Sequence, residues 1–204
     1  SSVWNLVGGS VPLIVGFLSI PFAIKGLGKE GFGILTIAWV VLGYFGMFDL
    51  GFAQATTKYC SQYLAKKEID KFTSVFWVSL ISSFSMGILG CVILMSSTPI
   101  LVNKFLIIPD LMKSDARLTF FILSASLPFI ISTTSLRGVL AASDRFDILN
   151  KIQMPSNVLT LIIPCFSYFF GIKLSVVITL IVIVRCIIFL IYILVLIMQR
   201  SLLP

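Results

Sequence analysis

One cation stands in the middle of an apolar stretch, where a charge needs a chemical partner. Arg185 is the sole charged residue between positions 174 and 198. A charge at the bilayer centre costs about 2.5–3.5 kcal/mol on insertion scales, so an acidic side chain, a water-filled cavity or an anionic ligand must offset it. We interpret Arg185 as lining a cavity; a structural ion pair and snorkelling to the interface are the alternatives.

Four other polar residues could share such a cavity. Lys25 closes the first apolar run and Arg137 follows the fourth, while Asp49 and Gln54 stand near the end of the second. Fixed positive charge in a low-dielectric cavity attracts anions such as diphosphates strongly. We therefore predict an anion-binding cavity formed by Lys25, Arg137 and Arg185, with Asp49 and Gln54 beside them.

Three of these residues also have a plainer interpretation. Lys25 could anchor the chain at the lipid headgroups, and Arg137 could follow from topology alone. Asp49 lies about 27 Å along a helix that starts at Gly31, so it could be a solvated or capping carboxylate near an interface. Whether the side chains converge depends on how the helices pack.

The residue types that carry most enzyme and metal chemistry are missing or scattered. The chain has no histidine, and its four cysteines form no CxxC pair. It shows no phosphate-binding glycine loop, no catalytic triad and no metal-ligand cluster. Asp144 and Asp147 have the spacing of helix neighbours, but Arg145 and Lys151 beside them indicate a solvated loop face. We therefore predict no metal, no cofactor and no enzymatic activity.

The composition places the chain in a bilayer. Of its 204 residues, 58% are hydrophobic and only 11% are charged, whereas a soluble domain carries about 25% charged residues. The formal net charge is +7, and most cations fall between apolar runs. Lipid headgroups and topology explain that charge, so nucleic acid is not expected as a partner.

The charge-poor intervals divide the chain into membrane spans, because a helix needs about 20 apolar residues to cross roughly 30 Å of hydrocarbon. Barrel strands would alternate apolar and polar residues, and these intervals do not. The expected fold is an all-α integral membrane protein, a six-transmembrane-helix bundle. Small residues at helical spacing predict close helix contacts along the third and fourth spans. The six spans are about 3–24, 31–57, 72–98, 117–140, 152–171 and 174–198.

Cation counts predict the orientation in the membrane. With the first residue in the cytoplasm, eight cations lie inside and six outside, which favours both ends of this chain in the cytoplasm. The inside set is Lys58, Lys66, Lys67, Lys71, Arg137, Arg145, Lys151 and Arg200, and the outside set is Lys25, Lys29, Lys104, Lys113, Arg117 and Lys173.

Three stretches of the sequence resemble a known family. They read IPFAIKGLGKEGFGIL from Ile20, FDLGFAQATTKYCSQY from Phe48 and VLAASDRFDILNKI from Val139. They are similar to the N-terminal half of polysaccharide-export flippases. These proteins are the lipid-linked O-antigen or oligosaccharide translocases of the multidrug/oligosaccharidyl-lipid/polysaccharide exporter superfamily. The similarity covers the first five spans in order.

This resemblance implies one lobe of a two-lobe transporter of the multidrug-exporter type. Residues 1–204 would form the N-terminal six-helix membrane lobe, and the second lobe is absent from this chain. The abrupt ends at Ser1 and Pro204 agree with a piece of a longer protein. The family moves a polyprenyl-diphosphate-linked oligosaccharide across the bacterial inner membrane by alternating access, for cell-surface polysaccharide biosynthesis.

The resemblance also implies which residues bind the substrate and which partners the protein has. Basic residues at the ends of the family's first two spans are matched here by Lys25 and Lys58, so Lys58 joins the expected substrate-binding set. No family motif matches Arg185, whose expected role rests on burial alone. The implied partners are a lipid-linked anionic saccharide, membrane lipids and other polysaccharide-assembly membrane proteins.

Three other functions remain open at this stage. A cation-coupled multidrug antiporter of the same fold would want a titratable acid deep in the cavity, and Asp49 is the available candidate. A membrane-embedded glycosyltransferase or polymerase would show a large hydrophilic loop, whereas the longest exterior loop, about 99–116, offers only Asp110 and Asp115 as acids. The third is a non-catalytic membrane subunit.

Overall fold

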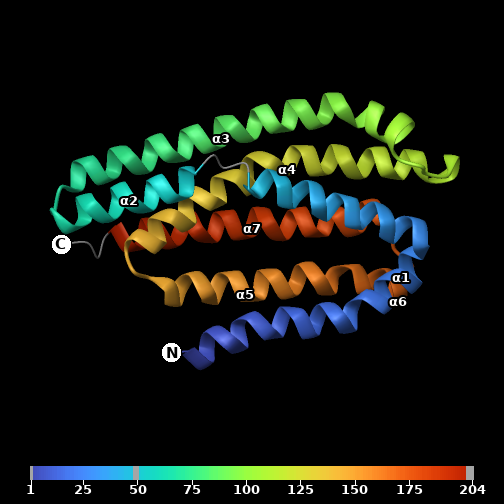
Figure 1. The fold of residues 1–204 in the computed structure, drawn as a ribbon, viewed down its shortest axis with the longest axis horizontal. Coiled ribbons are helices and arrows are strands. Elements are labelled where there is room, and N and C mark those ends of the chain that lie inside the picture. The colour runs from blue at the N-terminus through green and yellow to red at the C-terminus, as the bar shows by residue number, and fades with distance from the viewer. Residues whose placement is uncertain (1, 48–50, 201–204) are drawn as a thin grey trace.

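The computed structural model describes residues 2–47 and 51–200 (Figure 1). Within those ranges the regular elements are all helical, as predicted. They are α1 (Ser2–Met47), α2 (Phe52–Ala65), α3 (Ile69–Ile100), the π-helical turn η1 (Leu101–Phe105), α4 (Asp110–Ala142), α5 (Phe146–Ile162), the 3-10 turn η2 (Ile163–Cys165), α6 (Phe166–Phe170) and α7 (Leu174–Arg200).

The first two predicted spans are joined inside α1. Gly28 has φ 74° and ψ 169°, so the helix is interrupted there. Only glycine adopts this backbone conformation without strain from a Cβ atom. Figure 1 shows the blue helix turning back on itself at this point, so that α1 makes two passes in opposite directions. The chain thus reverses within residues 25–30, the short polar interval between the first two predicted spans.

The second pass continues beyond its predicted end. α1 ends at Met47, and α2 begins at Phe52 and runs on in the same general direction (Figure 1). Gly51, just before α2, has a left-handed backbone with φ 80°. α2 extends to Ala65, eight residues past the predicted boundary at 57. Asp49 lies outside the described residues.

Small residues bring α3 and α4 into close contact, as their spacing predicts. The hydroxyls of Ser83 and Ser135 share a hydrogen bond between the two helices. A Cβ atom on Gly87 would collide with the backbone of Pro128. Gly90 is also buried and lies against Leu127 and Phe45. Lipid supplies no hydrophobic drive for helix association, so this close packing holds the pair together.

The fifth pass is composite, because η2 separates α5 from the short helix α6. Pro155 lies within α5, and Pro164 lies in η2. None of the residues in α5 is buried. In the described part of the chain, four helical segments have the length and hydropathy of a membrane span: Ile14–Phe45, Ile69–Phe105, Asp110–Ala142 and Leu174–Met198. With the reversal at Gly28 and the α5–α6 pass, the six predicted helical passes are present.

α4 is the central helix and packs against α1, α2, α3 and α7 (Figure 1). One hydrophobic cluster joins Leu35 of α1, Leu123 and Leu127 of α4, and Ile178 and Ile181 of α7. A second joins Leu136 and Leu140 to Phe189 and Tyr192. α4 and α7 therefore run in the same direction, and Arg185 of α7 lies between the two clusters.

The bundle has two ends, and the loops assign residues to each. The α2 end carries the α2–α3 turn and the α4–α5 turn. The Gly28 end carries the α1 reversal, the segment before α4, and the link from α6 to α7 (Figure 1). These two names are used below.

Candidate functional site

Arg185 lies on the packed face of α7, deep between the two ends. Ile181, Phe189 and Tyr192 share that face and are buried. The Nε atom of Arg185 is also buried and has no hydrogen-bond partner in the described part of the chain. The sequence analysis requires an acidic side chain, a water-filled cavity or an anionic ligand beside Arg185. The groups around this Nε atom decide between these three alternatives.

No carboxylate pairs with Arg185 among the described residues. Their three ion pairs are Lys71 with Glu68, Lys113 with Asp110, and Arg145 with Asp147, all on exposed segments near helix ends. The guanidinium is therefore left with donors that a water-filled space or an anion could satisfy.

Tyr192 is a second polar group on the same face, and sequence reasoning missed its role. Its side chain is fully buried, and its hydroxyl lacks a hydrogen-bond partner among the described residues. It follows Arg185 by seven residues, which is two turns and about 10 Å along the helix. The spacing alone places both residues on one helical face, and the structure adds that the Tyr192 hydroxyl is buried without a partner among the described residues.

Arg137 lies beside Tyr192 at the α2 end of α4. Its neighbour Leu136 belongs to the same hydrophobic cluster as Tyr192. The side chain of Arg137 is exposed. α4 and α7 thus place one exposed guanidinium, one buried hydroxyl and one deeper guanidinium in order along the bundle.

Gln54 and Lys58 lie near Arg137 through the contact between α2 and α4. The Thr57 hydroxyl donates a hydrogen bond of 3.0 Å to the carbonyl of Gly138. A Cβ atom on Gly138 would lie only 2.7 Å from the Ala53 carbonyl oxygen, so the two helices touch here. Gln54 and Lys58 are exposed and stand within one turn of this contact.

Lys25 lies at the opposite end of the bundle. The next residue, Gly26, packs directly against Ser167 and Tyr168 of α6. Lys25 itself is exposed, one turn before the reversal at Gly28. The structure therefore groups Gln54, Lys58 and Arg137 at the α2 end, with Arg185 deeper in the bundle. Lys25 lies apart from them, and Asp49 is outside the described residues.

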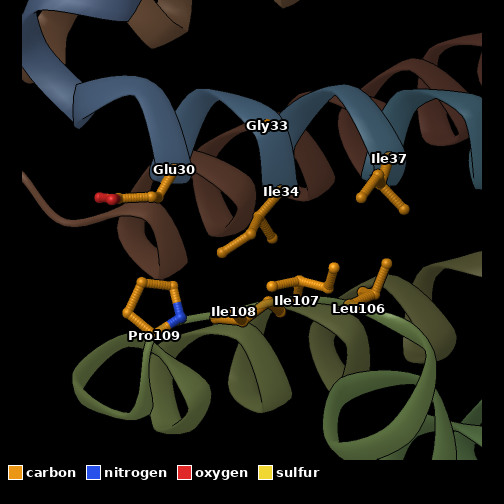
Figure 2. Close-up of a pocket in the computed structure, with 8 residues that line it drawn as sticks. All are labelled: Glu30, Gly33, Ile34, Ile37, Leu106, Ile107, Ile108 and Pro109. Carbon is orange, nitrogen blue, oxygen red and sulfur yellow. The ribbon is translucent and has the colours of Figure 1, made fainter.

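A groove at the Gly28 end offers different chemistry. It has a volume of about 160 Å³ and lies between the second pass of α1 and the segment before α4. Figure 2 shows Ile34 and Ile37 facing Leu106 and Ile107, with the Glu30 carboxylate at the edge. Its walls are mostly apolar and its charged group is an acid. It suits neither an anion nor a sugar.

Metal-binding groups do not gather in the described part of the chain. No cluster of three or more Cys, Asp or Glu side chains there could hold a metal ion. The four cysteines are free thiols spread over α2, α3, η2 and α7. The polar groups established along this part of the bundle are the guanidinium groups of Arg185 and Arg137 and the hydroxyl of Tyr192, which donate hydrogen bonds to anions rather than bind metals.

These features define an all-helical, multi-pass membrane protein with a cation deep among its helices. The chain matches the family described as polysaccharide biosynthesis protein over residues 1–202, and it belongs to that family. This confirms the resemblance found in the sequence.

One curated protein similar to this chain is named "Putative O-antigen transporter" and comes from Shigella flexneri. The two sequences are 29% identical over 175 residues, which cover 86% of this chain and 41% of the relative. The chain therefore spans about two fifths of the length of this curated relative. No solved structure matches the chain.

Proposed function

We propose that this chain is one lobe of a flippase for a polyprenyl-diphosphate-linked oligosaccharide. The protein would carry this cargo across the bacterial inner membrane by alternating access, for cell-surface polysaccharide biosynthesis. The family assignment and the name of the Shigella relative support a polysaccharide or O-antigen translocase. The chain covers 41% of the relative's length, which agrees with one lobe of a two-lobe protein; that residues 1–204 are the N-terminal lobe is part of the proposal.

The observation that carries this proposal is the unpaired donor of Arg185. Desolvating a guanidinium without a partner is strongly unfavourable, so a conformation or ligand that supplies one is needed. A diphosphate carries negative charge and oxygen acceptors, and a guanidinium binds such oxygens with two parallel hydrogen bonds. The cargo itself would then satisfy the group that the described residues leave unsatisfied.

The order of the cations along the bundle suggests the transport steps. Arg137 and Lys58 would attract the diphosphate at the α2 end, and Arg185 would hold it midway. Lys25, at the Gly28 end, would accept it before release. The polyprenyl tail would stay in lipid throughout, because moving a long hydrocarbon chain into water is very unfavourable. No covalent bond is made or broken in this scheme.

The proposed orientation follows from the cation count. With both ends of this chain in the cytoplasm, the α2 end faces the cytoplasm, where the lipid-linked saccharide would enter. The Gly28 end then faces the outer side. Membrane lipids surround the lobe, and other polysaccharide-assembly membrane proteins are proposed partners for receiving the cargo.

Reconstitution of the full-length protein tests this function. The lipid-linked saccharide that accumulates in cells lacking the gene is placed in proteoliposomes, and its exposure to an added glycosidase is followed over time. We expect the protein to bring saccharide from the inner leaflet to the outer one. No accumulation in the deletion strain, or no change in exposure, would contradict a flippase. Efflux of organic cations instead would point to a multidrug antiporter.

A further inference from the structure

A row of uncharged polar side chains runs along one face of α5. Asn150, Gln153, Asn157 and Thr160 recur every three or four residues. At 100° per residue they fall within about 80° of the helix circumference. We call these four residues the α5 polar face. The opposite side of α5 carries Pro155, Leu159 and Ile162, so the helix is amphipathic within the membrane.

The α5 polar face is open at the surface of the lobe, because Asn150 and Asn157 are exposed and Gln153 and Thr160 are half-buried. Leu161 flanks it on one side and lies against Gly16 of α1. Leu149 flanks it on the other side and packs in the cluster that contains Phe189 and Tyr192 of α7. The polar face therefore lies on one side of α5, between the sides that contact α1 and α7. On the opposite side of α5, Pro155 and Leu159 are exposed, whereas Ile148 and Ile152 pack in the same cluster.

The middle of this face is level with Arg185. Ile152 packs with the cluster of Phe189 and Tyr192, whereas Ile163, eleven residues later, packs with the cluster of Leu174 and Ile178. α5 and α7 are thus antiparallel neighbours. The stretch between those two contacts holds Gln153 and Asn157 on α5, and it holds Arg185 on α7.

The amides keep unused hydrogen-bonding groups. Gln153 Nε2 donates to Asn157 Oδ1 at 3.0 Å, which fixes the two side chains relative to each other. In the described part of the chain this leaves the Gln153 carbonyl oxygen and the Asn157 amide nitrogen available. The Thr160 hydroxyl donates a hydrogen bond to the Ser156 carbonyl at 2.9 Å, and its oxygen can still accept one. Amides facing hydrocarbon without partners would be costly, so a polar occupant is needed.

We propose that the α5 polar face binds the saccharide of the cargo, while Arg185 binds its diphosphate. This inference rests on the proposed flippase function. Neutral groups that both donate and accept hydrogen bonds match sugar hydroxyls, which do the same. A diphosphate would prefer the cations, and a polyprenyl chain would prefer the apolar side of α5. Because the face is level with Arg185, one cargo molecule can reach both groups at once.

Binding measurements with two lipids test this division. The full-length protein is placed in nanodiscs with either sugar-free undecaprenyl diphosphate or the lipid-linked saccharide that accumulates in cells lacking the gene. For the double variant Gln153→Leu/Asn157→Leu, we expect about tenfold weaker binding of the saccharide-bearing lipid, the size of two ordinary hydrogen bonds. Binding of the sugar-free lipid should stay unchanged, which also shows that the variant is folded.

Asn103→Leu is the matched control, because Asn103 is an exposed amide near the start of α4 that accepts a hydrogen bond from Arg117. It should leave both affinities unchanged. Equal losses for the two lipids in the double variant, or no loss for the saccharide-bearing lipid, would overturn the inference. Unchanged binding of the saccharide-bearing lipid is also expected if the α5 polar face packs against another part of the protein. A wild-type protein that binds neither lipid would overturn the proposed function as well.

Discussion

Arg185 and Tyr192 lie two helical turns apart on the same buried face of α7. Each carries a buried polar atom without a hydrogen-bond partner among the described residues. Two unsatisfied groups on one face of a membrane helix are unfavourable unless a ligand or water reaches them. The relationship therefore concerns function, because hydrophobic side chains at both positions would pack more stably.

Arg185→Ala in the full-length protein should abolish export of the saccharide. Loss of a buried guanidinium that binds an anion typically costs 2 kcal/mol or more, so transport should fall by at least about thirtyfold. Protein stability should be unchanged or higher, since an unpaired buried charge is removed. Export and thermal stability in detergent are measured together.

The matched control for this experiment is Arg145→Ala. Arg145 lies in the exposed α4–α5 turn and pairs with Asp147 at 3.4 Å. An exposed pair of this kind contributes little to stability, and we expect near wild-type export. Wild-type export by a well-expressed Arg185→Ala protein would remove Arg185 from the proposed mechanism.

Tyr192→Phe tests the hydroxyl alone, because the ring is kept. If the hydroxyl bonds to the cargo, transport should fall about two- to tenfold, the range for one hydrogen bond. Thermal stability should rise slightly, since a buried hydroxyl without a partner is removed. Both readouts are needed: lower stability together with unchanged transport would mean that Tyr192 has a structural partner and no contact with cargo.

Hydropathy predicted the helical passes of this fold well. The thickness of the bilayer and the free-energy cost of placing a charge in it constrain each segment independently of the others. The polar turn at Gly28 and the small-residue seam of α3 and α4 were also visible as local patterns. The candidate site was less predictable. The way each helix is rotated and which helices pack together bring Tyr192 near Arg137 and separate both from Lys25. The sequence of a single segment does not show that arrangement.

The α5 polar face was overlooked for a different reason. It has no charged side chain, and membrane sites are most easily predicted from charges; its amides and hydroxyl, spaced three and four residues apart from Asn150 onward, are nevertheless visible in the sequence. The left-handed backbone of Gly51, just before α2, was not predicted either, because glycine occurs at several other places in the same span.

Gly138→Val should destabilise the contact between α2 and α4. A Cβ atom at this position would lie 2.7 Å from the Ala53 carbonyl oxygen and 3.2 Å from the Thr57 hydroxyl. Overpacking of this kind costs about 1–3 kcal/mol, so the thermal midpoint of the full-length protein should fall. Gly33→Ala is the control, because a Cβ there meets nothing within 4 Å. A stable Gly138→Val protein would mean that α2 can move away from α4 at little cost.

Cysteine labelling of intact cells tests the orientation. In a variant with its four native cysteines replaced, Lys66→Cys marks the α2 end and Lys104→Cys marks the Gly28 end; both lysines are exposed. The cation count places the α2 end in the cytoplasm. A thiol reagent that cannot cross the inner membrane should therefore label Lys104→Cys in intact cells, and label Lys66→Cys only after permeabilisation. The reverse pattern would invert the proposed path, so that Lys25 would meet the cargo first and Arg137 last.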